Sequence, residues 1–316
     1  MGPLSAVGTA GTVVCVGEAM AVLTPADDVP LADASTFVRT IGGAELNVAL
    51  TLARLGVPTA WLSRLGDDGF GQHVAAVARA AGVDVSAVEF DRTRPTGLYV
   101  KTPGTAPDGS RRSAMLYYRA GSAASALSPA YLERPEVAAL LGRAGVVHVS
   151  GITAGLSDSA AAFCDALPGN ARLSVDLNYR PALWRDRDDA PLRRLLSRAD
   201  EVQLGADEAT AVFGTADPDA LLRALPRAAR ILLKREEHGV LVLEPGAPVR
   251  HVPALPVDVV EPVGAGDAFA AGYLAGQWHG LDVVDAVRLG HRCAAAALTV
   301  REDRPVTLPA WEGLAG

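Results

Sequence analysis

The residues best suited to do chemistry lie near the end of the sequence, in the segment EPVGAGD at positions 261–267, which leads into a predicted helix. Two glycines let the backbone turn tightly and point successive N–H groups outward, and a helix N-terminus adds partial positive charge. Such a turn favours an anion. The carboxylate of Asp267 can accept a proton from a substrate hydroxyl while the amides stabilise charge on a transferred phosphoryl group. The alternative is that Asp267 only caps a helix after a flexible turn.

A second polar segment, GGAELN at positions 42–47, leads into another predicted helix. The paired glycines Gly42 and Gly43 allow close approach of a polyol. Asn47, one turn into the helix, can donate hydrogen bonds to hydroxyl groups and accept them. The plainer interpretation is a helix entry with a structural asparagine.

A third polar segment, DLNYR at positions 176–180, follows a predicted strand. At that place polar side chains reach the crevice in which open α/β sheets bind their ligands. Arg180 suits a carboxylate or a phosphate because its guanidinium can bond two oxygens. On this segment alone, an ordinary surface arginine is the simpler interpretation.

Short apolar runs that alternate with segments of helical period must position these residues. The predicted strands cover residues 12–16, 59–62, 146–149, 173–176, 201–204 and 231–234. One helix is predicted over 44–55, and a second from a cap at Asp67 or Asp68 to Ala80. Two more are predicted to begin near 157 and 207, and a last long helix from about 266. This alternation is typical of an α/β fold with a mostly parallel sheet.

Two segments interrupt this rhythm. Residues 94–120 predict two alternating strands around a loop rich in Gly, Pro and Asp. Together with residues 21–40 they are expected to form a small β lid over the carboxyl ends of the parallel strands. No internal repeat or low-complexity linker divides the chain, so we predict a single domain over residues 12–310 after a flexible N-terminus at 1–11.

The composition excludes several classes of protein. Hydrophobic residues make up 49% of the 316 residues and charged residues 21%, which excludes a disordered chain. Lys and Arg total 29 against 36 Asp and Glu, a net charge of −7 with no basic stripe, so we expect no nucleic-acid partner. The three cysteines lie far apart, which predicts neither disulfides nor a zinc site and suits the cytoplasm. No run of eighteen apolar residues occurs, so no membrane span is predicted.

The sequence lacks the phosphate-binding and metal-binding motifs of several other folds. Neither Lys101 nor Lys234 lies in a GxxxxGK[ST] P-loop, and the turn at 264–266 lacks the GxGxxG spacing of dinucleotide-binding folds. HExxH, CxxC and GxSxG are absent, and the six histidines show no metal-ligand spacing.

Taken together, GGAELNVA at 42–49 and VGAGDAFAAG at 263–272 resemble the two signatures of the PfkB, or ribokinase-like, family of carbohydrate kinases. The resemblance implies a ribokinase-like three-layer α/β/α sandwich with a mostly parallel central sheet and a small β lid. It also implies ATP and Mg²⁺ as cofactors. Asp267 is then the general base, and the amides of Gly264, Ala265 and Gly266 form the anion hole.

The resemblance places the nucleotide across the C-terminal half of the chain. Glu208 in LGADEA resembles a family glutamate that holds Mg²⁺ through water, although Gly205 stands where Asn is usual. Asn178 and Lys234, with Gly264 and Gly266, are assigned to the nucleotide side of the site. Glu261 stands where many family members have an Asp that helps coordinate a monovalent cation, which puts potassium activation in question.

The segment LYYRAGSA at 116–123 resembles one found in the family's 2-keto-3-deoxygluconate kinases. The resemblance assigns substrate binding to the glycine pair and Asn47 and to four further residues, namely Tyr99, Tyr117, Arg119 and Arg180. The two arginines can pair with the carboxylate of an acid sugar, and a neutral sugar is expected to leave two buried cations partly unpaired. For the tyrosine and arginine of YYR the alternative is a solvated lid strand with cross-strand aromatic packing.

The predicted function is therefore ATP-dependent phosphorylation of the C6 hydroxyl of 2-keto-3-deoxygluconate. One alternative is a PfkB kinase for a neutral sugar such as fructose or ribose. Another is a sugar-binding or nucleotide-binding regulator without catalysis. Since the β lid of this family often pairs with another lid, a homo-oligomer formed through the lid is also expected.

Overall fold

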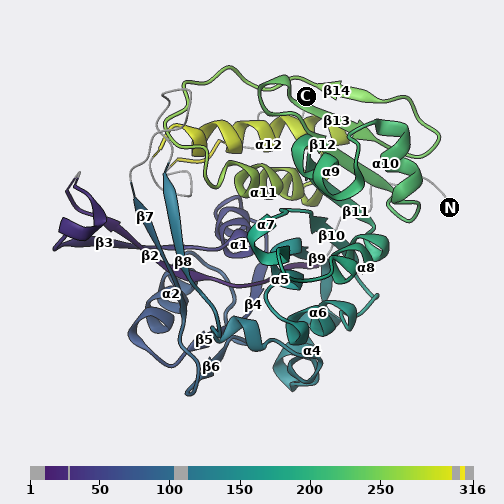
Figure 1. Cartoon of the computed structure of the whole chain (residues 1–316). Helices are drawn as coiled ribbons and strands as arrows, with labels where there is room; N and C mark the ends of the chain where they lie inside the picture. Colours follow the sequence, from purple (N-terminus) through teal and green to yellow (C-terminus); the bar gives the residue numbers. More distant parts are fainter. Residues whose placement is uncertain (1–10, 28, 103–112, 301–306, 310–316) are drawn as a thin grey trace.

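A central eight-stranded sheet runs through the part of the chain that the structure describes, with strand order β14-β13-β12-β11-β10-β9-β1-β4 (Figure 1). The structure is a computed structural model that describes residues 11–27, 29–102, 113–300 and 307–309. Six neighbouring strands, from β4 to β12 in that order, run parallel, and β13 and β14 pair antiparallel at one edge. The strands are β1 (Thr12–Val16), β4 (Thr59–Leu62), β9 (Ala144–Ser150), β10 (Arg172–Asp176), β11 (Glu201–Gly205), β12 (Arg230–Lys234), β13 (Val240–Leu243) and β14 (Arg250–Val252).

The side chains of β1 show why both faces of the sheet are covered. Val13 and Cys15 join the hydrophobic core on one side of the sheet. Val14 and Val16 join a second core on the other side, and all four side chains are buried. Burial on both faces is typical of strands in a parallel sheet.

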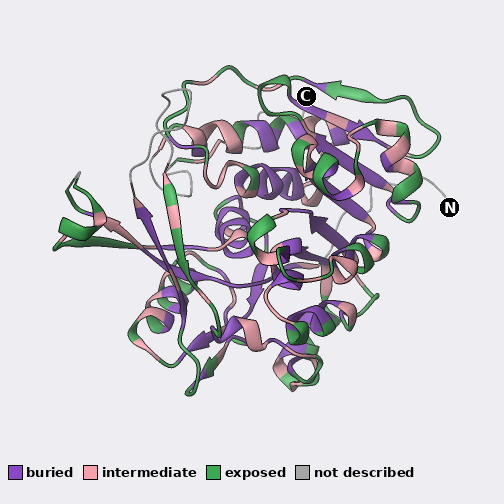
Figure 2. Cartoon of the chain, viewed as in Figure 1, coloured by how far each residue is buried: buried purple, intermediate pink, exposed green. Residues whose placement is uncertain are grey.

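Helices cover the sheet on both faces, and Figure 2 shows the buried residues gathered in the sheet and on the helix sides that face it. The first core packs under α1 (Ala44–Arg54), α2 (Gly69–Ala80), α11 (Ala265–Trp278) and α12 (Val283–Leu298). The second packs under α3 (Pro129–Leu132), α4 (Pro135–Gly142), α5 (Gly151–Gly155), α6 (Asp158–Asp165), α7 (Pro181–Trp184), α8 (Ala190–Arg198), α9 (Ala206–Phe213) and α10 (Pro218–Ala224). The predicted α/β/α sandwich is confirmed. No helix in the described ranges is long and apolar enough to cross a membrane.

The helix near position 266 was predicted to be the last one. That prediction is wrong, because another helix follows it. The predicted helix near position 266 is α11, but α12 comes after it and begins at a cap formed by Asp282, whose Oδ1 accepts hydrogen bonds from the amides of Val284 and Asp285. The cap of α2 is Asp68 rather than Asp67, since Asp68 Oδ1 accepts the amide hydrogens of residues 70 and 71.

Two glycines inside these last helices let α11 and α12 lie close together. A Cβ on Gly272 of α11 would lie 2.8 Å from Cys293 Sγ, and a Cβ on Gly290 of α12 would lie 2.9 Å from the Phe269 ring. Glycine costs about 1 kcal/mol relative to alanine inside a helix. Here that cost is offset by the packing of two helices across one face of the sheet.

A second, small sheet stands to one side of the sandwich, at the left of Figure 1. It has the strand order β3-β2-β7-β8 and is called the small sheet below. Its strands are β2 (Met20–Pro25), β3 (Phe37–Gly42), β7 (Gly97–Thr102) and β8 (Ala114–Tyr118), and β5 (Arg64–Gly66) and β6 (Glu89–Asp91) form a separate parallel pair. The antiparallel pair of β7 and β8 is the hairpin predicted within 94–120; its loop at 103–112 lies outside the described residues, as do residues 1–10, for which flexibility was predicted.

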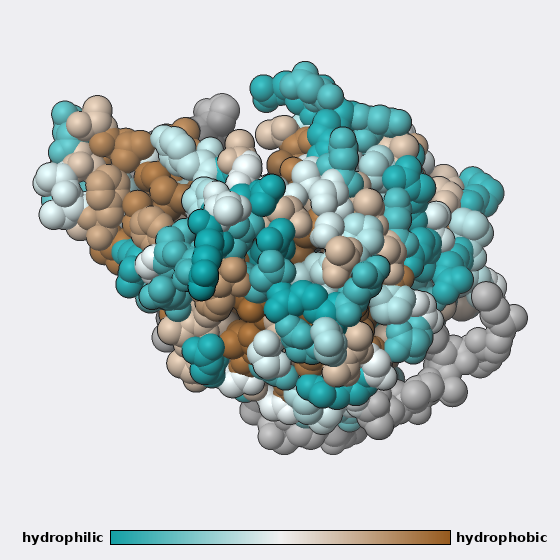
Figure 3. All heavy atoms as spheres, turned by 90° about the horizontal axis from the view of Figure 1, so that it is seen from below, coloured by the Kyte–Doolittle hydropathy of each residue, from teal (hydrophilic) through white to brown (hydrophobic). Residues whose placement is uncertain are grey.

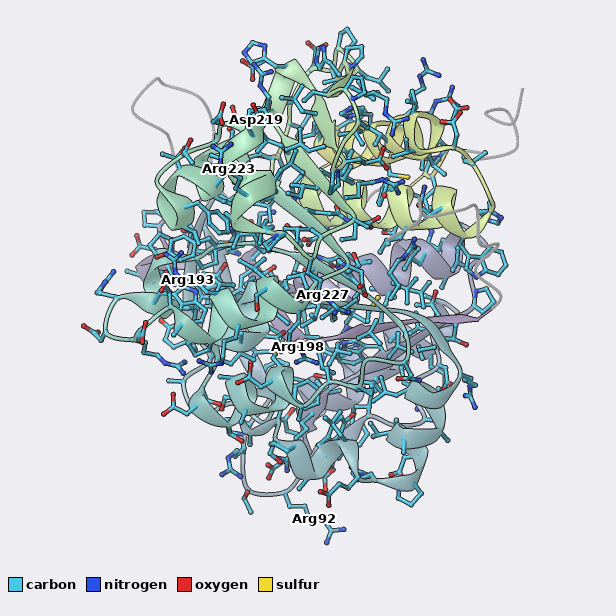
Figure 4. All side chains as sticks on the ribbon, turned by 90° about the vertical axis from the view of Figure 1, so that its right-hand side faces the viewer. Arg92, Arg193, Arg198, Asp219, Arg223 and Arg227 are labelled. Carbon is cyan, nitrogen blue, oxygen red and sulfur yellow. The ribbon has the colours of Figure 1, made fainter. Side chains whose placement is uncertain are left out.

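Arginines on the side of the molecule shown in Figure 4 stabilise the chain itself. Arg198 donates to the carbonyl oxygens of Cys164 and Asp165 at 2.8 and 2.6 Å, at the C-terminal end of α6. Arg227 donates to Arg198 O and pairs with Asp200. Such bonds satisfy the carbonyl groups that a helix end leaves free.

Candidate active site

Two segments that are 220 residues apart in sequence meet at Asp267. Asp267 lies in the first turn of α11, and Asn47 lies in the first turn of α1. Asn47 Nδ2 donates a hydrogen bond to Asp267 Oδ2 at 2.9 Å. Asn47 is buried, and its Oδ1 has no hydrogen-bond partner among the described residues. The two polar segments of the sequence therefore form one site.

The turn before α11 leaves backbone amides available. Gly264 has a φ of 82°, in the left-handed region that favours glycine, and its carbonyl accepts the amide hydrogen of Ala268 at 2.9 Å. Ala265 N makes a long bond of 3.4 Å to Pro262 O. No backbone acceptor within the described ranges takes the amide hydrogens of Gly266 or of the following residue. Together with the helix dipole, these N–H groups can bind an anion.

Asp267 is partly buried in acidic surroundings. Burial is the main reason that its pKa is raised to about 7, and the charges of Asp176 and Glu45 raise the pKa further. The hydrogen bond from Asn47 and the charge of Arg180 act in the opposite direction. Near neutral pH the Asp267 carboxyl is therefore balanced between its two forms, as a general base requires.

Lys234, at the end of β12, places a positive charge beside the turn. Its Nζ lies 3.1 and 3.2 Å from the two carboxylate oxygens of Asp176, at the end of β10. Burial alone would lower the pKa of Lys234, but the charges of Asp176, Glu208 and Asp267 outweigh burial, and the pKa is raised. A Cβ on Gly266 would lie 3.8 Å from Nζ, so the ammonium group and the turn face the same space.

Glu208, in the first turn of α9, connects two strand ends. Its Oε1 accepts the Tyr179 amide hydrogen at 3.0 Å, and its Oε2 accepts that of Gly205 at 2.8 Å. Burial, followed by the charge of Asp176, raises the pKa of Glu208. The carboxylate thus joins the loop after β10 to the end of β11 and lies beside the Lys234–Asp176 pair.

The oxygen atoms around Glu208 fit a magnesium ion that is held mainly through water and phosphate. Asn178 is buried with a φ of 38°, and its Oδ1 has no partner among the described residues. No group of three or more His, Cys, Asp or Glu in the described ranges is arranged to hold a metal ion. Mg²⁺ needs no such group, because it commonly keeps several waters and binds one or two carboxylates and the substrate's phosphates.

Gly42 and Gly43, the glycine pair predicted to allow close approach of a polyol, are each approached closely by another part of this chain. A Cβ on Gly42 would lie 2.3 Å from the Tyr99 hydroxyl oxygen. A Cβ on Gly43, which has a φ of 147°, would lie 2.4 Å from Glu18 O. Tyr99 is buried on β7, and its ring centre lies 5.4 Å from that of half-exposed Tyr117 on β8. β3 of the small sheet therefore leads directly into α1, and the Tyr99 hydroxyl of β7 lies against the end of β3.

Arg119 directly follows β8 and has an acidic partner that sequence analysis missed. Its Nη2 forms an ion pair with Glu18 Oε2, and Ser122 Oγ donates to Glu18 Oε1 at 2.5 Å. Its guanidinium carbon lies 5.6 Å from the centre of the Tyr117 ring. The expectation that Arg119 stays unpaired without an acidic ligand is wrong, because Glu18 neutralises it.

Arg180 was also expected to be a buried cation that a neutral sugar would leave partly unpaired, and this expectation is wrong as well. Its side chain is 51% exposed. Its Nη1 donates to Tyr179 O at 3.2 Å and lies 3.6 Å from Glu208 Oε1. The electrostatic argument against a neutral substrate therefore does not hold for either arginine.

Glu45 is a further site residue that sequence analysis missed. It is buried in the first turn of α1, where its Oε1 accepts hydrogen bonds from Ser150 N and Oγ and from Thr153 Oγ1 at 2.7 to 2.9 Å. Burial raises its pKa. Glu18 and Ser150 both stand at or just after the carboxyl end of a parallel strand, and that position was the signal that could have identified them.

A pocket of about 660 Å³ lies along the segment that leads from β14 toward α11. It is lined by Glu236, Glu237, Ala254, Leu255, Pro256, Val257, Asp258 and Leu298. The first two residues belong to the short helical turn η3 (Glu236–His238) that follows Lys234 and β12. Leu298 O accepts hydrogen bonds from the amides of Val260 and Glu261 in the loop that leads to α11. The volume is within the range of small-molecule sites.

Comparison with known proteins gives consistent matches over nearly the whole chain. The model of the pfkB family of carbohydrate kinases matches residues 10–311. The 2-dehydro-3-deoxygluconokinase of Thermoproteus tenax is 33% identical over 92% of this chain and 90% of that protein. Fructokinase-1 of Oryza sativa subsp. japonica is also 33% identical, over 84% and 83%. The structure of a fructokinase from Xylella fastidiosa with bound ATP superposes with a TM-score of 0.80 at 27% identity, covering 96% of this chain and 97% of that one.

Proposed function

The chain belongs to the PfkB family of carbohydrate kinases, and from this premise we propose that it phosphorylates the C6 hydroxyl of 2-keto-3-deoxygluconate with ATP. The observation that carries the proposal is the convergence of three features on one space: the Asp267 carboxyl, the free amides at the start of α11 and Lys234. This is the set of groups that phosphoryl transfer to a hydroxyl needs.

Asp267 acts as the general base in this proposal. The C6 oxygen attacks the γ-phosphorus, the bond from that phosphorus to the bridging oxygen of ADP breaks, and the hydroxyl proton passes to Asp267. Asn47 fixes Asp267 Oδ2, which leaves Oδ1 to face the hydroxyl. The amides of the turn at 264–266 and the Lys234 ammonium stabilise the charge on the phosphoryl oxygens.

The nucleotide side of the site comprises Lys234, Gly264 and Gly266, with the neighbouring 660 Å³ pocket for the base. Glu208 would hold Mg²⁺ through water, and Asn178 would offer its Oδ1 as a further oxygen. When bound, the ion neutralises phosphate charge. The ATP seen in the Xylella fastidiosa fructokinase structure supports ATP as the phosphoryl donor.

Arg119 is the proposed reader of the acid sugar's carboxylate. Glu18 occupies one end of its guanidinium, while its buried Nε has no hydrogen-bond partner among the described residues. A buried donor without a partner is costly, and a substrate oxygen would satisfy it. Tyr99 and Tyr117 are paired on β7 and β8 next to Arg119, and Arg180 is proposed to contact the same substrate. The name of the Thermoproteus tenax relative agrees with this substrate.

A neutral sugar is the second candidate substrate, since the rice fructokinase is also 33% identical to this chain, over 84% of it against 92% for the 2-dehydro-3-deoxygluconokinase of Thermoproteus tenax. We would measure ADP release by the purified protein with Mg-ATP, comparing 2-keto-3-deoxygluconate, fructose, ribose and adenosine at equal concentrations. A strong preference for the keto acid supports the proposal. Preference for fructose or ribose keeps the kinase and removes the roles given to Arg119 and Arg180. No turnover with any substrate would favour a non-catalytic binding protein.

A second copy of the chain is the proposed partner of the small sheet. Figure 3 shows apolar surface gathered over the small sheet at the left of the view. Phe37 and Val38 of β3 and Leu116, Tyr117 and Tyr118 of β8 are between 39% and 59% exposed. An exposed apolar patch of this kind marks an interface more often than a free surface. Light scattering after gel filtration should give twice the chain mass, and Val38→Asp should give the single-chain mass.

The cytoplasm is the proposed location of the reaction. Cys15, Cys164 and Cys293 are all buried free thiols. Unpaired thiols suit a reducing compartment.

A further inference from the structure

A buried ion pair joins the small sheet to the loop that leads to Asp267. Lys101 Nζ, on β7, lies 3.2 Å from Glu261 Oε2, and each side chain is only 8% exposed. Ser113 Oγ donates to the same Glu261 oxygen at 2.5 Å. Glu261 Oε1 accepts the amide hydrogen of Val263, one residue before the anion-binding turn, at 3.3 Å. Both oxygens of this carboxylate are therefore used by the protein.

The same loop is also held from the side of α12. The amides of Val260 and Glu261 donate to Leu298 O at 2.8 and 3.2 Å. Three parts of the chain thus meet at Glu261, and the turn at 264–266 starts three residues later. Any change in the position of this carboxylate is transmitted to the turn through the hydrogen bond with Val263 and the short chain between them.

The residues present do not fit the monovalent cation that the family resemblance places at this position. An alkali-metal ion needs oxygen ligands with free lone pairs and a local negative charge to balance. Here the negative charge of Glu261 is already balanced by a covalently attached ammonium group, which the ion would have to displace. A second cation next to Lys101 in a buried site is electrostatically unfavourable.

We propose that the Lys101 ammonium takes the place of a monovalent cation and positions the anion-binding turn, so that turnover does not depend on K⁺. Lys101 is a positioning residue in this proposal, since it acts on the turn through Glu261. The inference deepens the proposed kinase function and rests on it. It requires both Glu261 and a lysine at position 101.

The test compares KCl with choline chloride at equal ionic strength for the wild type and for Lys101→Met. Two quantities are measured: kcat with the best sugar substrate, and the midpoint of thermal unfolding without substrate. Lys101→Met/Glu261→Gln is the matched control, since it removes the charge that would attract a cation. Arg92→Met, which removes an 89% exposed cation, controls for the loss of one positive charge.

The wild type and Arg92→Met should show the same kcat and the same midpoint in both salts. Lys101→Met should lose about 10- to 100-fold in kcat in choline chloride through misplacement of the turn. In KCl it should recover part of that loss and unfold at a higher temperature, because K⁺ now binds Glu261. The double variant should not respond to K⁺.

Three results would overturn the inference: activation of the wild type by K⁺, an unchanged kcat in Lys101→Met, or a loss in Lys101→Met that no alkali-metal ion restores. Failure of the proposed kinase function looks different, because then no sugar supports ADP release by the wild type. The unfolding measurement needs no substrate, so it still tests the cation response of the Lys101–Glu261 pair in that case.

Discussion

Asn47 Nδ2 lies 2.9 Å from Asp267 Oδ2, and this single hydrogen bond joins the two glycine-containing segments of the chain. It holds Asp267, the proposed base, by one oxygen, and no hydrogen bond within the described residues reaches the other. It also lowers the pKa of Asp267 against the effect of burial, which is the larger of the two. The amide of Asn47 therefore orients the carboxyl of the proposed base and lowers its pKa.

Replacing the base should abolish most of the activity and leave the fold intact. Asp267→Asn keeps an oxygen that can accept the hydrogen bond from Asn47 but cannot take up a proton. We expect kcat to fall by roughly 10²- to 10⁴-fold. Steady-state ADP release with circular dichroism as the folding control would check this. Near-normal turnover in a folded variant would remove Asp267 from the mechanism.

The same variant should be more stable than the wild type above neutral pH. The pKa of Asp267 is about 7 in the folded chain, against about 3.9 for an unperturbed Asp. The folded state thus binds more protons than the unfolded state between about pH 4 and 7, and its stability falls as the pH rises through this window. At pH 8 the amide of Asp267→Asn avoids that loss, and we expect thermal unfolding about 2 °C or more higher. At pH 4 the difference should vanish.

The rate should follow the ionisation of Asp267. We expect kcat/KM for the sugar to increase with pH, with a midpoint near 7, because only the carboxylate can accept the proton. In Asn47→Ala the midpoint should move upward, since the hydrogen bond that lowers the pKa is lost. A rate that is flat from pH 5.5 to 8.5, with buffers of constant ionic strength, would contradict the assignment.

Arg119→Ala should act mainly on the binding of an acid sugar. Losing a hydrogen bond to a charged group costs about 1.5–3 kcal/mol, so we expect KM for 2-keto-3-deoxygluconate to rise by about 10- to 100-fold with KM for ATP unchanged. Because the alanine leaves Glu18 buried without its partner, Arg119→Lys is the second variant; it keeps the charge and should show a smaller increase. An unchanged KM in both variants would refute the carboxylate assignment.

A polar network far from the proposed chemistry should affect stability alone. Tyr273 OH donates to Glu201 Oε2 at 2.6 Å and accepts from Arg230 Nη1 at 2.9 Å, and all three residues are buried. Tyr273→Phe should cost about 1–3 kcal/mol in unfolding free energy. The value of kcat should not change, because Glu201 and Arg230 begin their strands and the site lies at the strands' other ends. Arg92→Met, at a side chain that is 89% exposed, is the control and should change neither quantity.

Much of the sandwich could be predicted because its strands are short and strongly apolar. Residues 12–16 and 59–62 match β1 and β4 residue for residue. The helix over 283–298 was not predicted. Gly290, inside this helix, disfavours helix formation in isolation. Gly290 instead stabilises the packed structure because it lets the Phe269 ring of α11 come close, and no local sequence pattern reveals that contact.

The site residues could be predicted where residue type and position at a strand end indicate their chemistry. The contacts between site residues that lie far apart in sequence could not be predicted in this way. Asp267 and Asn47 were both identified, but their contact spans 220 residues and appears only in the fold. Arg119 was expected to lack a counter-charge, although Glu18 lies just after β1. This pairing depends on how the end of β8 is placed next to the end of β1, and sequence spacing does not encode it.

The small sheet and the residue directly after β8 carry Tyr99, Tyr117 and Arg119, which are among the residues proposed to recognise the sugar. In contrast, α11 and the ends of β10 and β12 carry the groups proposed for phosphoryl transfer. Evolution can therefore exchange one module and conserve the other. Under the proposed assignments, substitutions on β7 and β8 are expected to change the substrate preference while the groups proposed for the reaction stay the same. This separation of substrate recognition from phosphoryl transfer agrees with the names of two relatives, a 2-dehydro-3-deoxygluconokinase and a fructokinase. Each is 33% identical to this chain.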